Sequence, residues 1–295
     1  VALAVFWLTA GMKGEGIRRW ANVMLIACVG LTLLTFVPGL GKTENSQTLW
    51  LDLGFVSLQP AELLKLASLL AVALAFSQMT ERPLYDPPYR NFPEYRRRFF
   101  WPLVRHNRPL ITGFFCAGLV LIQQDMATAC VIFVCMVAMY IVSGVSNWQI
   151  GKLLLIMGVI ALAFGALASY RVARVKNWIN RYDPAIINQG GFQQTRSEWA
   201  IVKGGWTGRG LTKGTIKKSL PTATSDFVMA TVAEETGLLG VWAIIGLMGA
   251  ISVRMLMLGA RAASYGRLVC TGAGVWVAAQ TAINICMVNA TIPAV

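Results

Sequence analysis

Charged residues and histidine are both scarce in this 295-residue sequence. Asp, Glu, Lys and Arg make up only 13% of the residues, whereas a typical soluble domain carries about 25%. The single histidine, His106, excludes zinc sites built from histidine pairs and argues strongly against a Ser-His-Asp triad. Any chemistry must therefore use Asp, Glu, Lys, Arg or backbone groups.

Redox and nucleotide-binding motifs are also missing. The six cysteines all fall within apolar runs and form no Cys-x-x-Cys pair, so we expect them to be small packing residues. No Gly-x-x-x-x-Gly-Lys-Ser/Thr sequence occurs, which excludes a nucleotide P-loop. There is no cleavable signal peptide, and both ends lie in apolar segments, so we expect the sequence to be part of a longer protein.

Hydrophobic residues are abundant, at 56% of the chain, and they gather into long runs. A helix of about 20 apolar residues crosses a membrane, and a spanning segment must satisfy its own backbone hydrogen bonds. The runs therefore predict an all-α, polytopic transmembrane helical bundle with about eight spans. The predicted spans cover residues 1–12, 21–38, 61–77, 110–123, 127–143, 152–169, 237–258 and 267–289.

The distribution of Arg and Lys predicts the orientation of these spans. Arg is concentrated in the loops 13–20, 78–109 and 259–266, whereas the loops 39–60 and 124–126 hold only one cation. The positive-inside rule therefore places the Arg-rich loops in the cytoplasm. The net charge of +13 favours contact with anionic lipid headgroups, and nucleic acid is a poorer match.

The same orientation places the long polar segment 169–236 outside the cell. This segment is basic, and its ten cations are Arg171, Arg174, Lys176, Arg181, Arg196, Lys203, Arg209, Lys213, Lys217 and Lys218. They favour either outer-leaflet headgroups or an anionic substrate, and the residues do not decide between these. Gly-rich turns, such as Gly204 to Gly210, suggest backbone N–H groups arranged to approach an anion.

Two further polar groups interrupt the apolar runs. Glu62 and Lys65 lie three residues apart, so they share a helix face and can form an ion pair, and Pro60 suits the first turn of that helix. They indicate either a cavity within the bundle or a simple ion pair at headgroup level. Asp125 lies in a short polar break that is either a tight turn or a broken helix.

The segment 169–236 ends with a candidate catalytic carboxylate. Ser225 and Asp226 precede an apolar run, where they suit the N-cap of a helix. An Asp at the start of a helix stays ionised, and this favours a general base of modest strength.

Taken together, these motifs resemble the SEDS peptidoglycan polymerases, the family that includes FtsW, RodA and SpoVE. The matching residues occur in the family's order over nearly the whole chain: Leu49 to Gly54, Gln59 to Lys65, Gln124 to Thr128, Arg174, Asp183-Pro184, Phe192-Gln193, Gly204 to Leu211, Leu220-Pro221, Ser225 to Ala230, Glu234 to Gly240, Gln280, Asn284-Ile285 and Pro293. The resemblance implies a single membrane domain with ten spans in the complete protein, in which residues 169–236 form the extracytoplasmic catalytic loop.

The resemblance also implies an activity, a site and partners. The activity is polymerisation of lipid II into glycan strands at the inner membrane during division or elongation, with undecaprenyl pyrophosphate as leaving group and Asp226 as the catalytic residue. A class B penicillin-binding protein, together with other divisome or elongasome membrane proteins, would be the partners. Basic side chains or a divalent cation, Mg²⁺ or Mn²⁺, would stabilise the leaving group. The candidate substrate-binding residues are Glu62, Lys65, Asp125, Arg174, Gln193, Arg209, Lys217 and Ser225, and the candidate structural residues are Trp50, Gln59 and Pro60.

The sequence departs from the family pattern at several positions. Thr224 replaces the His that precedes the catalytic Ser/Thr-Asp pair, Leu49 replaces an Arg, and Gln124 replaces a Pro. Two other classes remain open on the residues alone. A transporter or flippase for a lipid-linked precursor would also use polar groups within its spans. In a scaffold for division or elongation proteins, Asp226 would only cap a helix.

Overall fold

The computed structural model describes residues 14–44, 47–52, 57–79, 107–144, 147–167, 169–220 and 226–293. The chain divides into two compact units. Unit 1 comprises residues up to Val145 together with Arg254–Trp276, and unit 2 comprises Ser146–Val253 and the residues from Val277 onward. The predicted span 1–12 lies outside the described residues, as does most of the Arg-rich loop 78–109.

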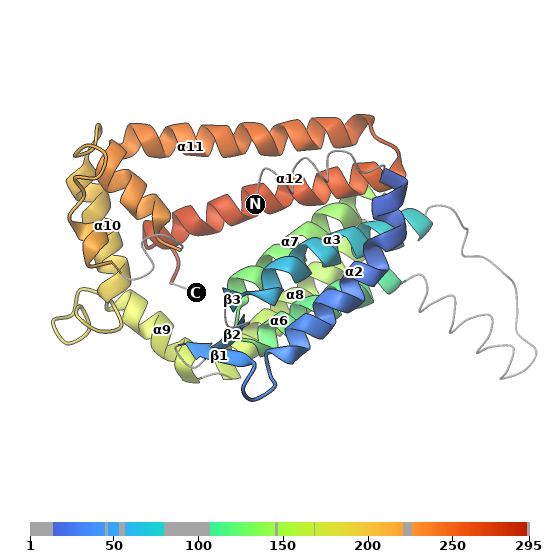
Figure 1. The fold of residues 1–295 in the computed structure, drawn as a ribbon, viewed down its shortest axis with the longest axis horizontal. Helices are drawn as coiled ribbons and strands as arrows, with labels where there is room; N and C mark the ends of the chain where they lie inside the picture. Colours follow the sequence, from blue (N-terminus) through green and yellow to red (C-terminus); the bar gives the residue numbers. More distant parts are fainter. Residues whose placement is uncertain are drawn as a thin grey trace, which may run out of the picture. The chain divides into compact units, whose positions relative to one another are not determined.

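Unit 1 is built mainly from four helices that lie side by side (Figure 1). They are α2 (Gly14–Leu34), α3 (Pro60–Met79), α6 (Arg108–Ile122) and α7 (Met126–Val142). Helix α3 packs against the other three, and α6 packs against α7. Pro60 is the first residue of α3, as predicted, because the first helical turn does not need the N–H group that proline lacks.

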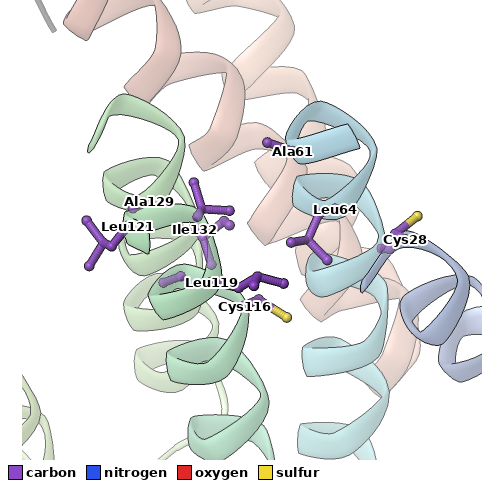
Figure 2. Close-up of a cluster of buried hydrophobic side chains, with 11 residues drawn as sticks. Cys28, Ala61, Leu64, Cys116, Leu119, Leu121, Ala129 and Ile132 are labelled. Carbon is purple, nitrogen blue, oxygen red and sulfur yellow. The ribbon is translucent and has the colours of Figure 1, made fainter. Parts of the chain in front are cut away.

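The core of unit 1 combines small residues with branched apolar ones, as Figure 2 shows. Cys28, Ala61, Cys116 and Ala129 are buried among larger side chains such as Leu64. Small residues let helix backbones approach closely, and this is how helices associate where lipid removes the hydrophobic driving force. The prediction that cysteines serve as packing residues is confirmed for these two, and none of the six forms a disulfide.

The segment 39–60, predicted as a loop, contains a small antiparallel sheet. Its strands β1 (Gly41–Glu44), β2 (Gln47–Asp52) and β3 (Ser57–Leu58) pair in the order β1-β2-β3. Trp50, a predicted structural residue, lies in β2 and pairs with Lys42 of β1. β1 and β3 are too short to give a period-2 signal, and the six residues of β2 do not alternate between polar and apolar, so the pattern did not indicate the sheet.

Unit 2 contains α8 (Asn147–Leu167), α9 (Ser169–Ile179), α10 (Phe192–Gly204), the short 3₁₀ helix η2 (Ile216–Lys218) and most of α11 (Val228–Arg261). Helix α12 (Ser264–Val288) begins in unit 1 and ends in unit 2. The segment 169–236, predicted as one large extracytoplasmic loop, contains α9, α10 and the first turns of α11. Its many polar residues hid these helices from a hydropathy pattern.

Four described helices are long and apolar enough to cross a membrane: α2, α3, α11 and α12. Three shorter apolar stretches, Arg108–Ile122, Met126–Val142 and Ile150–Val159, coincide with other predicted spans. The chain is therefore a multi-pass helical membrane protein, as predicted. The predicted loop 13–20 is wrong, since α2 already begins at Gly14; its polar first turn resembles a loop in composition.

Candidate functional site

The first polar group of unit 1 joins the starts of α3 and α7. Asp125 caps α7, because its Oδ1 accepts a hydrogen bond from the backbone N–H of Thr128 at 2.9 Å. Its other oxygen, Oδ2, accepts one from Nε2 of Gln59 at 3.3 Å. The motif that contains Gln59 and the motif that contains Asp125 are far apart in the sequence. The carboxylate of Asp125 brings them together, because one oxygen caps α7 and the other binds the residue before α3.

The break between α6 and α7 is a tight turn, which resolves the two alternatives left by the sequence. Gln124 adopts a positive φ of 70° there, and α6 and α7 pack against each other on either side of the turn. Beside it, the buried Gln123 donates from Nε2 to Oγ1 of Thr35 at 2.8 Å. This hydrogen bond ties the turn to the end of α2.

Lys65 is the most deeply buried cation among the described residues, with 4% of the residue exposed. Its ammonium lies 2.7 Å from Oε1 of Glu62 and 5.3 Å from the ring centre of Trp276. A buried ammonium needs such partners because its desolvation is costly. The predicted ion pair is confirmed. The cavity beside Lys65, also lined by Cys135 and Trp276, measures about 10 Å³, the size of one water.

In unit 2, a paired arginine ties α10 to the turn after α9. Arg181 binds both oxygens of Glu198, from Nε at 3.2 Å and from Nη2 at 2.9 Å. Tyr182 donates to the same carboxylate at 2.5 Å, and this hydrogen bond raises the pKa of the Tyr182 phenol. Arg181, predicted only as one of ten cations, therefore has a structural partner.

The polar face of α10 is directed inward, toward the end of α12. Gln194 donates to the carbonyl of Ile292 at 2.8 Å, and the buried Ser197 donates to the carbonyl of Val288. From α9, Trp178 donates to the carbonyl of Ala290 at 2.7 Å. The last residue of α12 and the residues that follow it thus receive hydrogen bonds from α9 and α10.

The Gly-rich turn after α10 is joined to a kink in α11 by backbone hydrogen bonds. Gly237 has φ 71° and ψ −172°. Around this residue, the N–H of Arg209 donates to Glu234 at 3.0 Å, and the N–H of Leu238 donates to Gly205 at 2.9 Å. The N–H groups of Gly208 and Gly210 also donate to backbone carbonyls. The interpretation of these glycines as an anion-binding nest is therefore wrong at residues 208–210.

Side-chain atoms are excluded from this contact because the backbones are too close. A Cβ at Gly204 would lie 1.8 Å from the carbonyl oxygen of Ala233. At Gly208, a Cβ would lie 2.2 Å from the carbonyl oxygen of Glu235. The glycines are needed so that α10 can approach α11 closely. A Gly-rich turn in a sequence is compatible both with this close packing and with anion binding by backbone N–H groups.

Replacing Gly204 by Ala is expected to destabilise the protein by about 1–3 kcal/mol, the range for overpacking a closed contact. The measurement is thermal unfolding of the purified protein in detergent. The matched control is Gly249→Ala, since a Cβ at Gly249 of α11 meets nothing within 4 Å. An equal unfolding temperature for both variants would contradict the close approach.

Glu234 is the side chain that organises the segment before α11, and the sequence analysis did not single it out. The residue is 0% exposed. Its carboxylate accepts hydrogen bonds from the backbone N–H groups of Thr215 at 2.7 Å, Ile216 at 2.9 Å and Lys217 at 3.2 Å. These N–H groups open η2, so the carboxylate caps this short helix. A carboxylate at the start of an apolar run was the signal that would have identified it.

The neighbouring Glu235 has a different partner, because its carboxylate forms an ion pair with the ammonium of Lys217. Lys217 was predicted to bind substrate, and the structure shows that its charge is shared with a carboxylate. Both glutamates therefore hold residues 215–217. Glu234 binds the backbone N–H groups of this stretch, and Glu235 binds the side chain of Lys217.

Asp226 is exposed and lies just before α11. The next residue, Phe227, is only 2% exposed and packs in a core with Ile216, Leu220 and Ala230. This core anchors the residue that follows the candidate carboxylate. The helix begins at Val228, two residues after Asp226.

The remaining candidates lie at scattered places. Arg174 is in α9, Gln193 is in the first turn of α10, and Arg209 is exposed in the Gly-rich turn. Ser225 lies outside the described residues, as does Thr224. Glu62, Lys65 and Asp125 belong to unit 1, whereas Arg174, Gln193, Arg209, Lys217 and Asp226 belong to unit 2. Within the described ranges, no three His, Cys, Asp or Glu side chains gather as metal ligands do.

These features define a class of protein, a multi-pass helical membrane protein with a folded polar segment that ends in an exposed carboxylate. Comparison with known proteins gives the particular family. The chain belongs to the FtsW/RodA/SpoVE family of cell cycle proteins, whose family model matches residues 1–295.

Named relatives support this assignment. The chain is 31% identical to a probable peptidoglycan glycosyltransferase FtsW of Aliivibrio salmonicida over 87% of its own length and 61% of the relative. It is 30% identical to the corresponding protein of Pseudoalteromonas translucida, covering 97% of the chain and 68% of that relative. The chain thus spans about 61% of the first of these relatives.

A solved structure confirms the fold. The chain matches one chain of a peptidoglycan synthase complex with a TM-score of 0.73 and 22% identity, over 99% of this chain and 77% of that chain. At this level of identity, the match supports the arrangement of helices and carries no assignment of residues.

Proposed function

We propose that this protein is a peptidoglycan glycosyltransferase that polymerises lipid II into glycan strands, and that residues 169–236 form the catalytic segment of a single membrane domain. The relatives named above are probable peptidoglycan glycosyltransferases, which supports the reaction class. The observation that carries the proposal is the placement of Asp226, an exposed carboxylate whose neighbour Phe227 is anchored in a core.

The rigidity of this placement suits a catalytic group. Phe227 shares its core with Ile216 and Leu220, and the backbone around Ile216 is held by the buried Glu234. A positioned base acts only when it is held within hydrogen-bond reach of the proton that it removes. In this proposal, the core and the Glu234 cap provide that positioning.

In the proposed reaction, a sugar hydroxyl of the acceptor attacks the anomeric carbon of the donor. Asp226 takes the proton of that hydroxyl as the new glycosidic bond forms. The bond from the anomeric carbon to the lipid pyrophosphate breaks, and its electron pair leaves with the pyrophosphate. Cationic groups stabilise the charge on this leaving group.

The cations of unit 2 are the proposed binding groups for the pyrophosphate. Lys217 follows Ile216 in the sequence, and Ile216 shares a core with Phe227, the residue after Asp226; this supports a role for Lys217 near the same site. Arg174, Gln193, Arg209 and Ser225 are proposed as further contacts with the substrate. Glu62, Lys65 and Asp125 of unit 1 are also proposed as substrate-binding residues. A divalent cation, Mg²⁺ or Mn²⁺, would add Lewis-acid stabilisation of the pyrophosphate when bound.

We also propose that the protein lies in the bacterial inner membrane with the segment 169–236 outside the cytoplasm. The positive-inside rule supports this orientation, because Arg-rich loops stay in the cytoplasm. A class B penicillin-binding protein is the proposed partner, which would cross-link the new strands. The likeness to a chain of a peptidoglycan synthase complex supports such an assembly.

The test compares polymerisation with transport. The full-length protein, together with its transpeptidase, is reconstituted in vesicles with labelled lipid II, and the products are separated by gel. Glycan chains longer than the disaccharide are expected. Movement of labelled lipid II across the vesicle membrane without any glycan product would instead indicate a flippase, and neither outcome would indicate a scaffold.

A further inference from the structure

The outward face of α10 exposes large apolar side chains, although this helix lies in the long polar segment 169–236. Val202 is 78% exposed and Trp199 is 41% exposed. Because these two residues and Lys203 follow the i, i+3, i+4 spacing, they lie on one face of the helix. The turn that follows continues the pattern, since Trp206 is 68% exposed and Leu211 is 70% exposed.

The polarity of α10 is therefore the reverse of what water would favour. A helix on a water-soluble surface buries its apolar stripe and exposes its polar one. In α10, the buried residues include Gln194, Thr195 and Ser197, which bond to backbone carbonyls. Ile201 packs against the core around Phe227, whereas Trp199 and Val202 are exposed. Exposed apolar surface costs about 25 cal/mol per Å², so this face is suited to an environment less polar than water.

Hydrogen bonds place this face at the level where a membrane span begins. The N–H of Leu239 donates to the carbonyl of Trp206 at 3.2 Å. Leu239 is 59% exposed and Trp242 is 63% exposed, and both belong to the apolar part of α11. The turn that carries Trp206 is therefore at the depth of the first turn of that apolar stretch. Tryptophan is enriched at this depth, the boundary between hydrocarbon and headgroups.

The charge beside this face is positive. Lys203, Arg209, Lys213 and Lys218 are exposed. Three acidic side chains of the segment already have partners, since Glu198 binds Arg181, Glu235 binds Lys217 and Glu234 caps η2. Exposed cations next to apolar anchors bind the anionic headgroups of phospholipids.

An arginine also stiffens the aromatic part of the face. The guanidinium of Arg196 lies 5.0 Å from the ring centre of Phe192 and 5.0 Å from that of Trp199. Contact with two rings holds the cation and the aromatic groups together. Such a cluster presents apolar rings to the acyl boundary and positive charge to phosphate.

We propose that α10 and the turn after it form a membrane-docking face, made of Trp199, Val202, Lys203, Trp206, Arg209, Leu211 and Lys213, which lies in the headgroup layer and binds anionic phospholipid. The face holds the segment 169–220 against the membrane surface beside α11. This proposal concerns the placement of the segment in the membrane and holds whether or not the protein polymerises lipid II.

The test measures the depth of residue 202 in a bilayer. A fluorescent amino acid is incorporated at position 202 of the full-length protein in nanodiscs of phosphatidylcholine and phosphatidylglycerol, with a quencher at the top of the lipid acyl chains. The matched control carries the same probe at position 185, because Ala185 is exposed in the polar turn beside Asp183. Quenching is expected to be several-fold stronger at position 202 than at position 185.

The charge contribution is tested in the same nanodiscs with the double variant Lys203→Glu, Lys213→Glu. Its quenching at position 202 is expected to fall toward that in pure phosphatidylcholine. Equal quenching at positions 202 and 185 would overturn the proposal, and so would protection of position 202 only when the partner protein is added. An unchanged signal in the double variant would overturn the part that concerns anionic lipid.

Discussion

Replacing Asp226 by Asn is expected to reduce the rate of lipid II polymerisation by about 10²- to 10⁴-fold, the usual contribution of a positioned general base. The amide has nearly the same shape as the carboxylate but cannot take a proton at neutral pH. Asp226 is exposed, so the free energy of unfolding should change by no more than about 0.5 kcal/mol. The measurements are the glycan assay described above and thermal unfolding of the same preparation.

Asp183→Asn is the matched control for this substitution. Asp183 is another exposed aspartate of the segment 169–236, and its Oδ1 accepts a hydrogen bond from the N–H of Ala185 at 2.9 Å. It has no assigned part in the reaction, so polymerisation by this variant should stay near the wild-type rate. If Asp226→Asn also polymerises at the wild-type rate, Asp226 is not the base. Equal losses in both variants would indicate a general need for negative charge.

Replacing Glu234 by Ala is expected to lower the free energy of unfolding by about 3 kcal/mol or more. The substitution leaves three backbone N–H groups, those of Thr215, Ile216 and Lys217, without their buried acceptor, and each such loss costs about 1–3 kcal/mol. Polymerisation should fall as well, because η2 and the core around Phe227 are then no longer held in place. Thermal unfolding and the glycan assay together measure both effects.

The neighbouring residue supplies the control. Glu235→Gln removes the ion pair with Lys217 but keeps a hydrogen-bonding side chain, so the expected change is within about 1 kcal/mol. Glu234→Gln should fall between the two, since one amide oxygen can still accept from η2. A Glu234→Ala variant as stable as Glu235→Gln would show that the cap is not needed to hold this stretch.

The membrane-spanning part of the fold was largely predictable from the sequence. Long apolar runs dictate helices because lipid leaves backbone groups no other partner, and α3, α6 and α7 begin and end within a few residues of the predicted spans. The Glu62–Lys65 ion pair followed from helical spacing alone. The small sheet around Trp50 was not predicted, because β2 does not alternate between polar and apolar residues and its two neighbouring strands are very short.

The candidate site was predictable only in part. The family pattern led to Asp226, and the structure places it at the surface beside an anchored residue. The frame that holds it was missed, because Glu234 and the glycines act through backbone contacts between segments distant in the sequence. The spacing of residues along one helix predicts which of them share a face of that helix, but it does not predict contacts with another segment. The contact of Gly204 with Ala233 depends on how α10 and α11 approach, which no local pattern contains.

The junction of α10 and α11 is made from main-chain atoms. Its geometry therefore does not depend on which side chains surround it. Residues on the lipid-facing surface of α11 can exchange one apolar type for another without moving Gly204, Gly208 or Gly237, because hydrogen bonds between peptide groups fix their distances. Mutational tolerance should therefore change abruptly along the chain, being broad over the apolar surface and nearly absent at these three glycines. A protein built in this way can adapt to membranes of different lipid composition while the distance between its proposed catalytic carboxylate and the bilayer stays constant.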